Sequence, residues 1–341
     1  MKKIIVTGGI GYIGSHTYVD LLEHGFEVIS IDNLCRSDKR IIDGIQKISG
    51  KEVRNYQIDL KNKKAVVDIL QEHADAFGVI HFAAYKSVPE STLKPLMYYR
   101  NNMEGLYNIL EGMQSAKIQN LIFSSSCSVY GFAKELPIRE STPLGEAQCP
   151  YARTKQQGEQ VLMDVCKASA LQVVLLRYFN PVGAHPSSEI GELSLDTPNN
   201  LVPFITQTAI GKREKLVVFG DDYPTRDGSC IRDYIHVCDI AHAHTLALQY
   251  LIREGSLKDN PEIFNLGTGT GMSVLEIIRA FERATGQKVN FSIGGRRPGD
   301  VIEAYADNHK AKEKLGWEIQ YSLEDMMLSA WNWEKKLAQP A

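Results

Sequence analysis

Residues 7–14 read Thr7-Gly8-Gly9-Ile10-Gly11-Tyr12-Ile13-Gly14, after the apolar run 4–7 and at the start of a stretch of helical periodicity, 12–24. Glycines at positions 8, 11 and 14 allow a sharp turn, a close approach of the backbone to a pyrophosphate and tight packing of the helix on the sheet. The N–H groups and the positive dipole end of the helix then face the phosphates. Strand, glycine loop and helix in this order predict a dinucleotide-binding unit.

An acidic residue stands at the end of the second expected strand, 28–31. Asp32 lies 18 residues after Gly14, near the expected offset of about 20. A carboxylate there binds both ribose hydroxyls and repels a 2′-phosphate, which predicts NAD rather than NADP. Arg36 is a contrary sign, but we expect the carboxylate to prevail because a buried like-charge contact is costly. Asp59, after the third strand, is expected to bond the adenine edge or to cap the next helix.

The first half of the chain alternates between apolar runs and helical stretches. Strands are expected at 4–7, 28–31, 53–58, 78–82, 120–124 and 173–176, and helices at 12–24, 65–73, 106–115 and 152–166. This order predicts a parallel sheet with right-handed crossovers and helices on both faces. After residue 180 prolines and glycines become frequent. We expect an α/β protein with a Rossmann-type doubly wound sheet over 1–180, to which the chain returns around 234–265, and a smaller α/β substrate domain over 181–341.

The composition excludes several classes of partner. A net charge of -3 over 341 residues offers no basic face for nucleic acid, and no apolar run reaches the roughly 18 residues of a membrane span. Six cysteines without a CxxC pair are typical of reduced thiols in the cytoplasm. The nine histidines show no ligand spacing, so no metal is expected. His242 and His244, at i,i+2, should point to different sides of a helix.

A catalytic group is predicted around a second local pattern. Tyr151 and Lys155 are four residues apart near the start of a helix, which places both side chains on one face. An ammonium beside the phenol is expected to lower its pKa from about 10. The tyrosine can then take a proton from a sugar hydroxyl, and Ser126 at the end of the fifth strand can bond the same hydroxyl.

Together with further stretches, these motifs resemble the UDP-glucose 4-epimerases of the extended short-chain dehydrogenase/reductase superfamily. The resemblance covers essentially the whole chain, and its later motifs are specific. They are Tyr98-Tyr99-Arg100-Asn101-Asn102, Leu176-Arg177-Tyr178-Phe179-Asn180-Pro181-Val182-Gly183-Ala184-His185-Pro186, Pro198-Asn199-Asn200-Leu201, Gly228-Ser229-Cys230-Ile231-Arg232-Asp233-Tyr234-Ile235-His236-Val237 and Arg296-Arg297-Pro298-Gly299-Asp300.

The resemblance implies two sets of binding residues besides the three loop glycines. Contacts to a permanently bound NAD would come from Tyr12, Ile13, Asp32, Asn33, Leu34, Cys35, Arg36, Ser37, Asp59, Leu60, Phe82, Ala83, Ala84, Tyr85, Lys86, Asn101, Ser126, Tyr151, Lys155 and Phe179. A UDP-sugar would be held by Lys86, Ser126, Tyr151, Asn180, Asn200, Leu201, Val217, Val218, Phe219, Arg232, Arg297, Asp300 and Ala304. Two arginines suit a diphosphate because a guanidinium binds phosphate oxygens in pairs.

The implied reaction interconverts UDP-glucose and UDP-galactose through a 4-keto sugar that turns over in the pocket, in a cytoplasmic homodimer of galactose metabolism. In relatives the position of Ala304 lines the sugar pocket, where a small residue admits an N-acetyl group. This predicts turnover of UDP-GlcNAc and UDP-GalNAc too, although a one-residue shift would place Tyr305 there.

Two alternatives remain open at this point. A nucleotide-sugar 4,6-dehydratase shares the fold but commonly has an Asp-Glu pair where this chain has Cys127-Ser128. A regulator that binds NAD without catalysis would not need Ser126, Tyr151 and Lys155.

Overall fold

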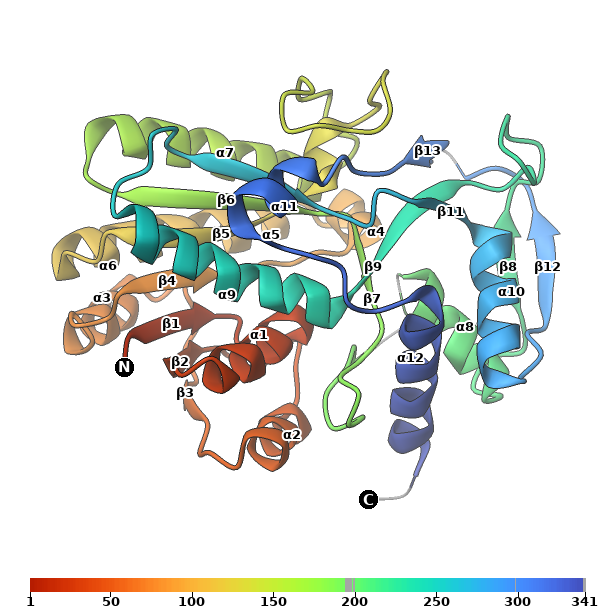
Figure 1. Ribbon diagram of the computed structural model, residues 1–341, viewed down its shortest axis with the longest axis horizontal. Helices are drawn as coiled ribbons and strands as arrows, with labels where there is room; N and C mark the ends of the chain where they lie inside the picture. Colours follow the sequence, from red (N-terminus) through yellow and green to blue (C-terminus); the bar gives the residue numbers. More distant parts are fainter. Residues whose placement is uncertain (194–197, 199, 298, 340–341) are drawn as a thin grey trace.

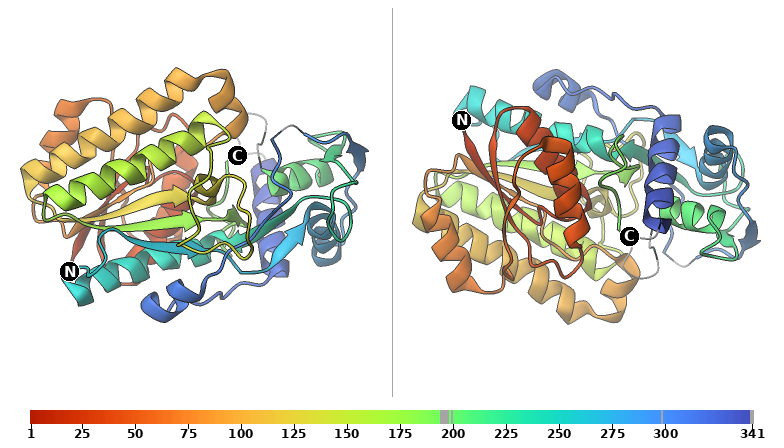
Figure 2. Two further views of the ribbon diagram at one scale, coloured as in Figure 1. Left: turned by 90° about the horizontal axis from the view of Figure 1, so that it is seen from above. Right: turned by 90° about the horizontal axis from the view of Figure 1, so that it is seen from below.

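The computed structural model of the chain describes residues 1–193, 198, 200–297 and 299–339. A seven-stranded sheet lies between two layers of helices, and a smaller part with short strands and helices α8, α10 and α12 lies at the right of Figure 1. Figure 2 shows the sheet between the helices of its two faces.

All strand pairs of the large sheet are parallel, as expected from the alternation of apolar runs and helical stretches. The strand order is β10-β6-β5-β4-β1-β2-β3. The order therefore reverses between β1 and β4, and ligands bind at such a switch point in doubly wound folds. The bounds are β1 Lys3–Thr7, β2 Glu27–Ile31, β3 Arg54–Tyr56, β4 Gly78–His81, β5 Asn120–Ser126, β6 Gln172–Tyr178 and β10 Glu262–Leu266.

The strand expected at 53–58 is shorter than predicted. Only Arg54–Tyr56 pairs, at the edge of the sheet beside β2, and its residues are half-buried or exposed. An edge strand lacks a second neighbour to extend its ladder, so the apolar run alone overstated its length.

The two faces of the sheet carry different helices because side chains alternate along each strand. Ile4 and Val6 of β1 pack with the core under α1, α2, α9 and α11, whereas Ile5 packs with the core under α3, α6 and α7. The helix bounds are α1 Tyr12–Glu23, α2 Lys39–Ser49, α3 Lys63–Glu72, α4 Val88–Leu93, α5 Pro95–Tyr99, α6 Gly105–Ala116, α7 Pro150–Ala168, α9 Val237–Glu254 and α11 His309–Leu315. Helices α2, α4, α5 and α11 were not expected.

The smaller part has its own apolar core, which includes Ile205, Tyr234, Phe281 and Met327. Its strands are β7 Asn180–Val182, β8 Leu216–Phe219, β9 Ile231–His236, β11 Gly271–Ser273, β12 Phe291–Gly294 and β13 Glu303–Ala304, and its helices are α8 Leu201–Ala209, α10 Val274–Thr285 and α12 Leu323–Ala338. Between these elements the chain runs back through α9, which packs on α1, and through β10, which pairs with β6. Among the described residues, no helix has the length and apolar character to cross a membrane.

Candidate active site

The glycine loop between β1 and α1 leaves no room for side chains. Gly8 has a φ of +70°, and a Cβ there would lie 2.8 Å from the Ala83 nitrogen in the loop after β4. A Cβ on Gly14 would overlap the Gly8 carbonyl oxygen. Gly11 is the N-cap of α1 and has no side chain to cap the helix, so the first-turn N–H groups are available to an anion. The cradle fits a pyrophosphate.

Asp32 follows β2 at the same edge of the sheet. Its carboxylate accepts hydrogen bonds from the backbone N–H of Ile10 at 3.1 Å and of Leu34 at 2.9 Å. Burial raises its pKa, and these hydrogen bonds oppose that shift. Leu34 has a φ of 60°, so the chain bends sharply around the carboxylate. Asp32 is therefore fixed beside the glycine loop, where the predicted ribose would lie.

Arg36, the contrary sign for the cofactor, is already engaged. Its Nη2 donates to both carboxylate oxygens of Glu90, at 2.9 and 3.0 Å, and its guanidinium carbon lies 5.0 Å from the centre of the Tyr85 ring. The hydrogen bond to Glu90 raises the pKa of Arg36. A guanidinium held by a carboxylate is a poor site for a second anion, and no sequence pattern pointed to Glu90.

Asp59 is not the cap of the next helix. That position belongs to Asn62, whose side chain accepts from the Ala65 N–H at 3.2 Å. Asp59 instead accepts from the Lys61 N–H at 2.9 Å. Of the two predicted roles, the helix cap is wrong and the adenine contact stays a prediction.

The loop after β4 is held by a residue that the sequence reasoning did not single out. Asn102 accepts from the Tyr85 N–H at 2.8 Å and donates to the Tyr85 carbonyl at 3.1 Å and to Thr154 of α7 at 3.0 Å. Asn102 lies in a π-helical turn, Arg100–Glu104, a feature frequent at functional sites. It ties the predicted cofactor loop to the helix of Tyr151 and Lys155. Its neighbour Asn101 donates to the Asn102 side chain.

The three predicted catalytic residues come together at the carboxyl end of β5. Ser126 ends that strand, and Tyr151 stands in the first turn of α7, close enough for Ser126 to lower the pKa of its phenol. Lys155, one turn later, is buried and donates to the Ser124 carbonyl oxygen at 2.6 Å.

The expected lowering of the tyrosine pKa is wrong for the protein alone. Burial raises the pKa of Tyr151 to about 12, although the Ser126 hydrogen bond lowers it. Burial lowers the pKa of Lys155 to about 8, and Glu159 opposes this shift. The sequence placed the lysine one turn from the phenol, but in the folded chain the loss of solvent is the largest cause of both shifts.

A buried ion pair supports the catalytic group from behind. Glu159, one turn after Lys155, accepts from Arg177 Nη2 at 2.6 Å, from Arg177 Nε at 2.9 Å and from the hydroxyl of Ser125 at 2.5 Å. The side chains of the pair are 2% and 0% exposed. The pair joins α7, β5 and β6 beneath the reactive side chains, and its members were not predicted as site residues.

Two predicted diphosphate ligands share one carboxylate. Asp300 lies 2.5 Å from Arg297 Nη2 and 4.0 Å from Arg232 Nη2. The guanidinium carbon of Arg297 also lies 5.5 Å from the centre of the Phe219 ring. Arg297 and Asp300 line an open hollow of about 430 Å³ together with Phe132, Tyr223, Arg296, Gly299 and Ile302. An aromatic wall beside two arginines suits a nucleoside diphosphate.

Glu192 connects the two predicted ligand sites and was missed. The same carboxylate oxygen accepts from Lys86 Nζ at 2.7 Å and from the side-chain amide of Asn200 at 2.8 Å. Lys86 also lies over the Tyr12 ring, at 5.5 Å from its centre, and the Tyr12 hydroxyl donates to the Gly183 carbonyl at 2.6 Å. Nothing local marks Glu192, because its partners lie at 86 and 200.

Ala304 and Tyr305 lie in different surroundings. Ala304 packs against the apolar cluster that contains Phe179, Val129 and Tyr130, with Cys127 at its border. The Tyr305 ring lies instead against Gly271, where a Cβ would be 3.0 Å from it. The register of β13 beside β9 pairs Ala304 with Arg232. The role of Ala304 in the sugar pocket stays a prediction.

Other predicted residues lie on the elements around the same edge. The Phe82 ring packs at a tilt against His244, with ring centres 4.6 Å apart, and the Leu60 carbonyl accepts from Asn108. Asn180 starts β7, Leu201 starts α8 and Val217 and Val218 lie in β8.

Cys35 Sγ lies 4.0 Å from the Tyr85 hydroxyl, and Ser37 donates to Asp32. Asn33 accepts from the Cys35 N–H, and Ala84 follows Ala83 in the loop after β4. Asn199 and Pro298 of the quoted motifs lie outside the described residues.

The histidines on α9 point to different sides, as predicted. His244 is buried and hydrogen-bonds the Tyr178 hydroxyl at 2.6 Å, whereas His242 faces Asp20 of α1 at 3.3 Å. His24 lies beside the same aspartate, so groups without ligand spacing along the sequence meet in the fold. Histidines separated by more than 200 residues carry no spacing signal.

The sequence of the chain is similar to those of known proteins. Residues 5–329 match the family model described as GDP-mannose 4,6 dehydratase. A UDP-glucose 4-epimerase of Bacillus subtilis (strain 168) is 46% identical over 332 residues, which cover 97% of this chain and 96% of that protein.

Two solved structures are similar over nearly the whole chain. The UDP-glucose-4-epimerase of Stenotrophomonas maltophila, solved with bound NAD and formylated UDP-arabinopyranose, has a TM-score of 0.95 and 45% identity, with 99% of each chain covered. The UDP-Glc/GlcNAc 4-epimerase of Campylobacter jejuni has a TM-score of 0.84 and 35% identity, with 98% of this chain and 100% of that chain covered. These likenesses confirm the predicted Rossmann-type fold.

Proposed function

Because this chain belongs to the UDP-glucose 4-epimerase family, we propose that Tyr151, Ser126 and Lys155 carry out the inversion of C4 that converts UDP-glucose into UDP-galactose. The chain is an isomerase, and NAD is its cofactor. The observation that carries the assignment is the meeting of Ser126 and Tyr151 at the carboxyl end of β5, at the same sheet edge as the glycine loop.

The residues present fit the cofactor. The N–H groups at the start of α1 would hold its pyrophosphate and Asp32 one ribose, and the Arg36–Glu90 pair supports NAD over NADP. When bound, NAD would supply the acceptor for the C4 hydride, and return of that hydride would restore it in each turnover.

Tyr151 acts as the base of the reaction. It would remove the proton of the sugar 4-hydroxyl as C4 gives up its hydride, so that the two losses together leave a ketone at C4, and it would later return the proton. Ser126 lies close enough to the phenol to lower its pKa and would hold the same sugar hydroxyl. Lys155 contributes a positive charge one turn along α7, which favours the phenolate.

The substrate is anchored by its nucleotide. Arg232, Arg297 and Asp300 would hold the diphosphate and Phe219 the uracil, which leaves few fixed contacts for the hexose. The ketosugar can then turn about the bonds to its diphosphate and present its other face. Residues 1–180, which contain the glycine-rich loop, would form the NAD-binding domain, to which the chain returns around 234–265. Residues 181–341 would form the domain that binds the UDP-sugar.

A dehydratase is the second candidate because of the matching family model. Elimination needs an acid and a base near C5 and C6, and the place after β5 holds Cys127 and Ser128. Burial raises the pKa of Cys127 to about 12, so the thiol stays neutral and is a poor base. This observation favours epimerisation.

A small side chain next to the reactive group supports a wider sugar range. Ala304 borders the cluster of Phe179 and Cys127, and a methyl group there leaves space for an N-acetyl substituent. We expect Ala304→Tyr to abolish turnover of UDP-GlcNAc and to retain that of UDP-glucose. Tyr305→Ala is the matched control because its ring faces Gly271, and it should change neither activity. Wild-type protein inactive on UDP-GlcNAc would contradict this extension.

A homodimer is supported by apolar side chains outside the two cores. Leu93 and Leu96 at the α4–α5 junction are 81% and 70% exposed. Tyr107 of α6, which follows soon after them in the sequence, is exposed too. The predicted apolar faces of α6 and α7 are instead internal, since Leu106, Ile109 and Leu162 pack on the sheet. Light scattering should give a dimer that Leu93→Glu dissociates and Leu328→Glu, on α12, does not.

The cellular setting follows from chemistry. Six free cysteines fit the reducing cytoplasm, and interconversion of UDP-glucose and UDP-galactose serves galactose metabolism. Loss of growth on galactose after deletion of the gene would test this role.

Purified protein incubated with UDP-galactose separates the candidates. UDP-glucose should form, and deuterium placed at C4 should remain at C4. Tyr151→Phe should lower turnover by roughly 10²–10⁴-fold while NAD stays bound, and Tyr107→Phe should not. A 4-keto-6-deoxy sugar would indicate the dehydratase, and a fully active Tyr151→Phe variant would refute the assigned base.

A further inference from the structure

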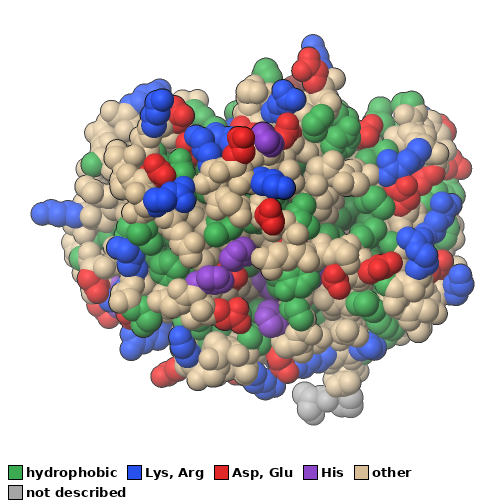
Figure 3. Space-filling model, in the orientation of Figure 1, with side chains coloured by type: hydrophobic (Ala, Val, Ile, Leu, Met, Phe, Trp, Pro, Cys, Tyr) green, Lys and Arg blue, Asp and Glu red, His purple; other side chains and the backbone are tan. Residues whose placement is uncertain are grey.

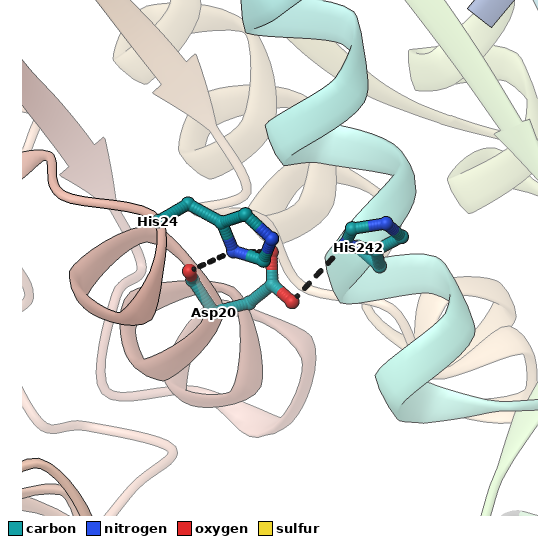
Figure 4. Close-up of side chains that lie close together, drawn as sticks. All are labelled: Asp20, His24 and His242. Carbon is teal, nitrogen blue, oxygen red and sulfur yellow. Dashed lines mark hydrogen bonds and ion pairs between the residues drawn. The ribbon is translucent and has the colours of Figure 1, made fainter. Parts of the chain in front are cut away.

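Three potential metal ligands meet where helix α1 packs on helix α9, away from the reactive residues (Figure 4). Asp20 and His24 lie one turn apart at the end of α1, and His242 reaches them from α9. Each offers a ligand atom, and these atoms all lie within 4.8 Å of one another. Histidine side chains gather next to acidic ones on this face of the molecule (Figure 3).

The spacing of the ligand atoms suits a small tetrahedral ion. Bonds of about 2.0–2.1 Å to nitrogen and oxygen separate neighbouring ligands of a tetrahedral zinc ion by roughly 3.4 Å. Asp20 Oδ1 lies 3.3 Å from His242 Nδ1, and a ring nitrogen of His24 lies within 4.8 Å of both groups. The carboxylate and one imidazole therefore already stand at ligand spacing, and the second imidazole lies next to them.

The surroundings orient these groups as the partners of metal ligands do. His24 Nδ1 donates to the main-chain oxygen of Asp20 at 2.7 Å, which leaves the lone pair on Nε2. The carboxylate of Asp20 accepts from the hydroxyl of Thr245 on α9. Ligating histidines usually donate their other N–H to a carbonyl or carboxylate, and ligating carboxylates are themselves hydrogen-bonded. The side chains of Asp20, His24 and His242 are 18%, 35% and 23% exposed, so an ion can enter.

We propose that Asp20, His24 and His242 bind a divalent transition-metal ion of the zinc type, which links α1 to α9. Such an ion is bound by imidazole and carboxylate with a water completing the tetrahedron. Glu23 and Asp239 lie close enough to contribute to the charge of this region, and both favour a cation. The ion has a structural role: it fixes the helix that carries the glycine loop to the helix that follows β9.

Titration of the NAD-loaded protein with Zn²⁺ alone tests the site, after treatment with a chelator and its removal. Calorimetry should give one equivalent, and Co²⁺ should give the visible absorption of a tetrahedral site. His24→Gln and His242→Gln should each weaken binding by at least roughly tenfold. Zn²⁺ should raise the melting temperature of the wild type and of neither variant.

His309→Gln is the matched control. His309 lies 3.1 Å from Glu313, one turn along α11, and is likewise at the surface. Among the described residues, His309 belongs to no group of three potential metal ligands. Its loss should therefore leave the affinity for Zn²⁺ unchanged. Absence of saturable binding below about 1 mM Zn²⁺, or equal binding by wild type and the two histidine variants, would overturn the proposal. Equal binding would place the metal on the free thiols.

Discussion

Replacement of Glu159 by glutamine removes the charge of the buried carboxylate behind the catalytic group. Its partner Arg177 is 2% exposed and makes two hydrogen bonds to it, at 2.6 and 2.9 Å. A buried guanidinium without its counter-ion costs about 3–5 kcal/mol. The exposed pair Lys64–Asp68, whose side chains are 86% and 55% accessible, contributes no more than about 0.5 kcal/mol. Lys64→Gln is therefore the matched control.

Urea unfolding of the NAD-loaded protein, followed by tryptophan fluorescence, measures the difference. With a slope near 3 kcal/mol per molar urea, the midpoint of Glu159→Gln should fall by roughly 1–2 M, and that of Lys64→Gln should hardly move. Equal midpoints for the two variants would show that the buried pair contributes no more to the free energy of unfolding than the exposed pair, which would refute the reasoning.

The same variant tests whether Glu159 acts through Lys155. Burial lowers the pKa of Lys155 to about 8, and Glu159 holds it up. Without that carboxylate the pKa of Lys155 falls further, so the ammonium is lost at lower pH. The alkaline limb of turnover should therefore move to lower pH, a change that lost stability alone does not produce. An unmoved limb would show that Glu159 only supports the fold.

Three further outcomes are expected. Turnover should decline as pH rises through about 8, because burial lowers the pKa of Lys155 to that value. The protonated lysine is the form that favours the phenolate. Lys155→Arg should therefore remove this alkaline decline from the pH profile of kcat. Glu90→Gln releases Arg36 from its bidentate pair, so cofactor-free protein should bind NADP roughly tenfold more tightly in a fluorescence titration, and adding Arg36→Ala should cancel the gain. Gly14→Ala places a Cβ against the carbonyl of the glycine loop, so the purified variant should retain less NAD than Gly295→Ala, where a Cβ meets nothing within 4 Å.

Residues close together in the sequence were predictable because their chemistry needs only one turn of chain. The glycine loop, Asp32 at a strand end and the Tyr151–Lys155 pair each rest on the period of a strand or a helix. Their environment was not predictable. The pKa of Tyr151 is raised to about 12 by burial, since it depends on how much solvent the folded chain leaves beside the phenol.

Two of the unexpected helices show the same limit for the fold. Helices α4 and α5 have only 6 and 5 residues, with Pro89 and Pro95 in their first turns, so they are too short to show an apolar period. Packing decides them: Tyr98 of α5 is fully buried. Helix α2 does show a helical apolar period, which the prediction overlooked, and its Ile41 and Ile45 join the core under α1.

By itself the sequence determined the parallel α/β sheet, the dinucleotide loop and the catalytic pair. The hydrogen-bond geometry of helices and strands repeats every few residues, and this period is visible in the order of apolar and polar residues along the chain. Only the tertiary structure decided which distant groups meet. Glu192 joins Lys86 to Asn200, and Asp20 gathers His24 and His242 across more than 200 residues. Such contacts depend on how the helices and loops stack in space, and no spacing along the chain encodes that stacking.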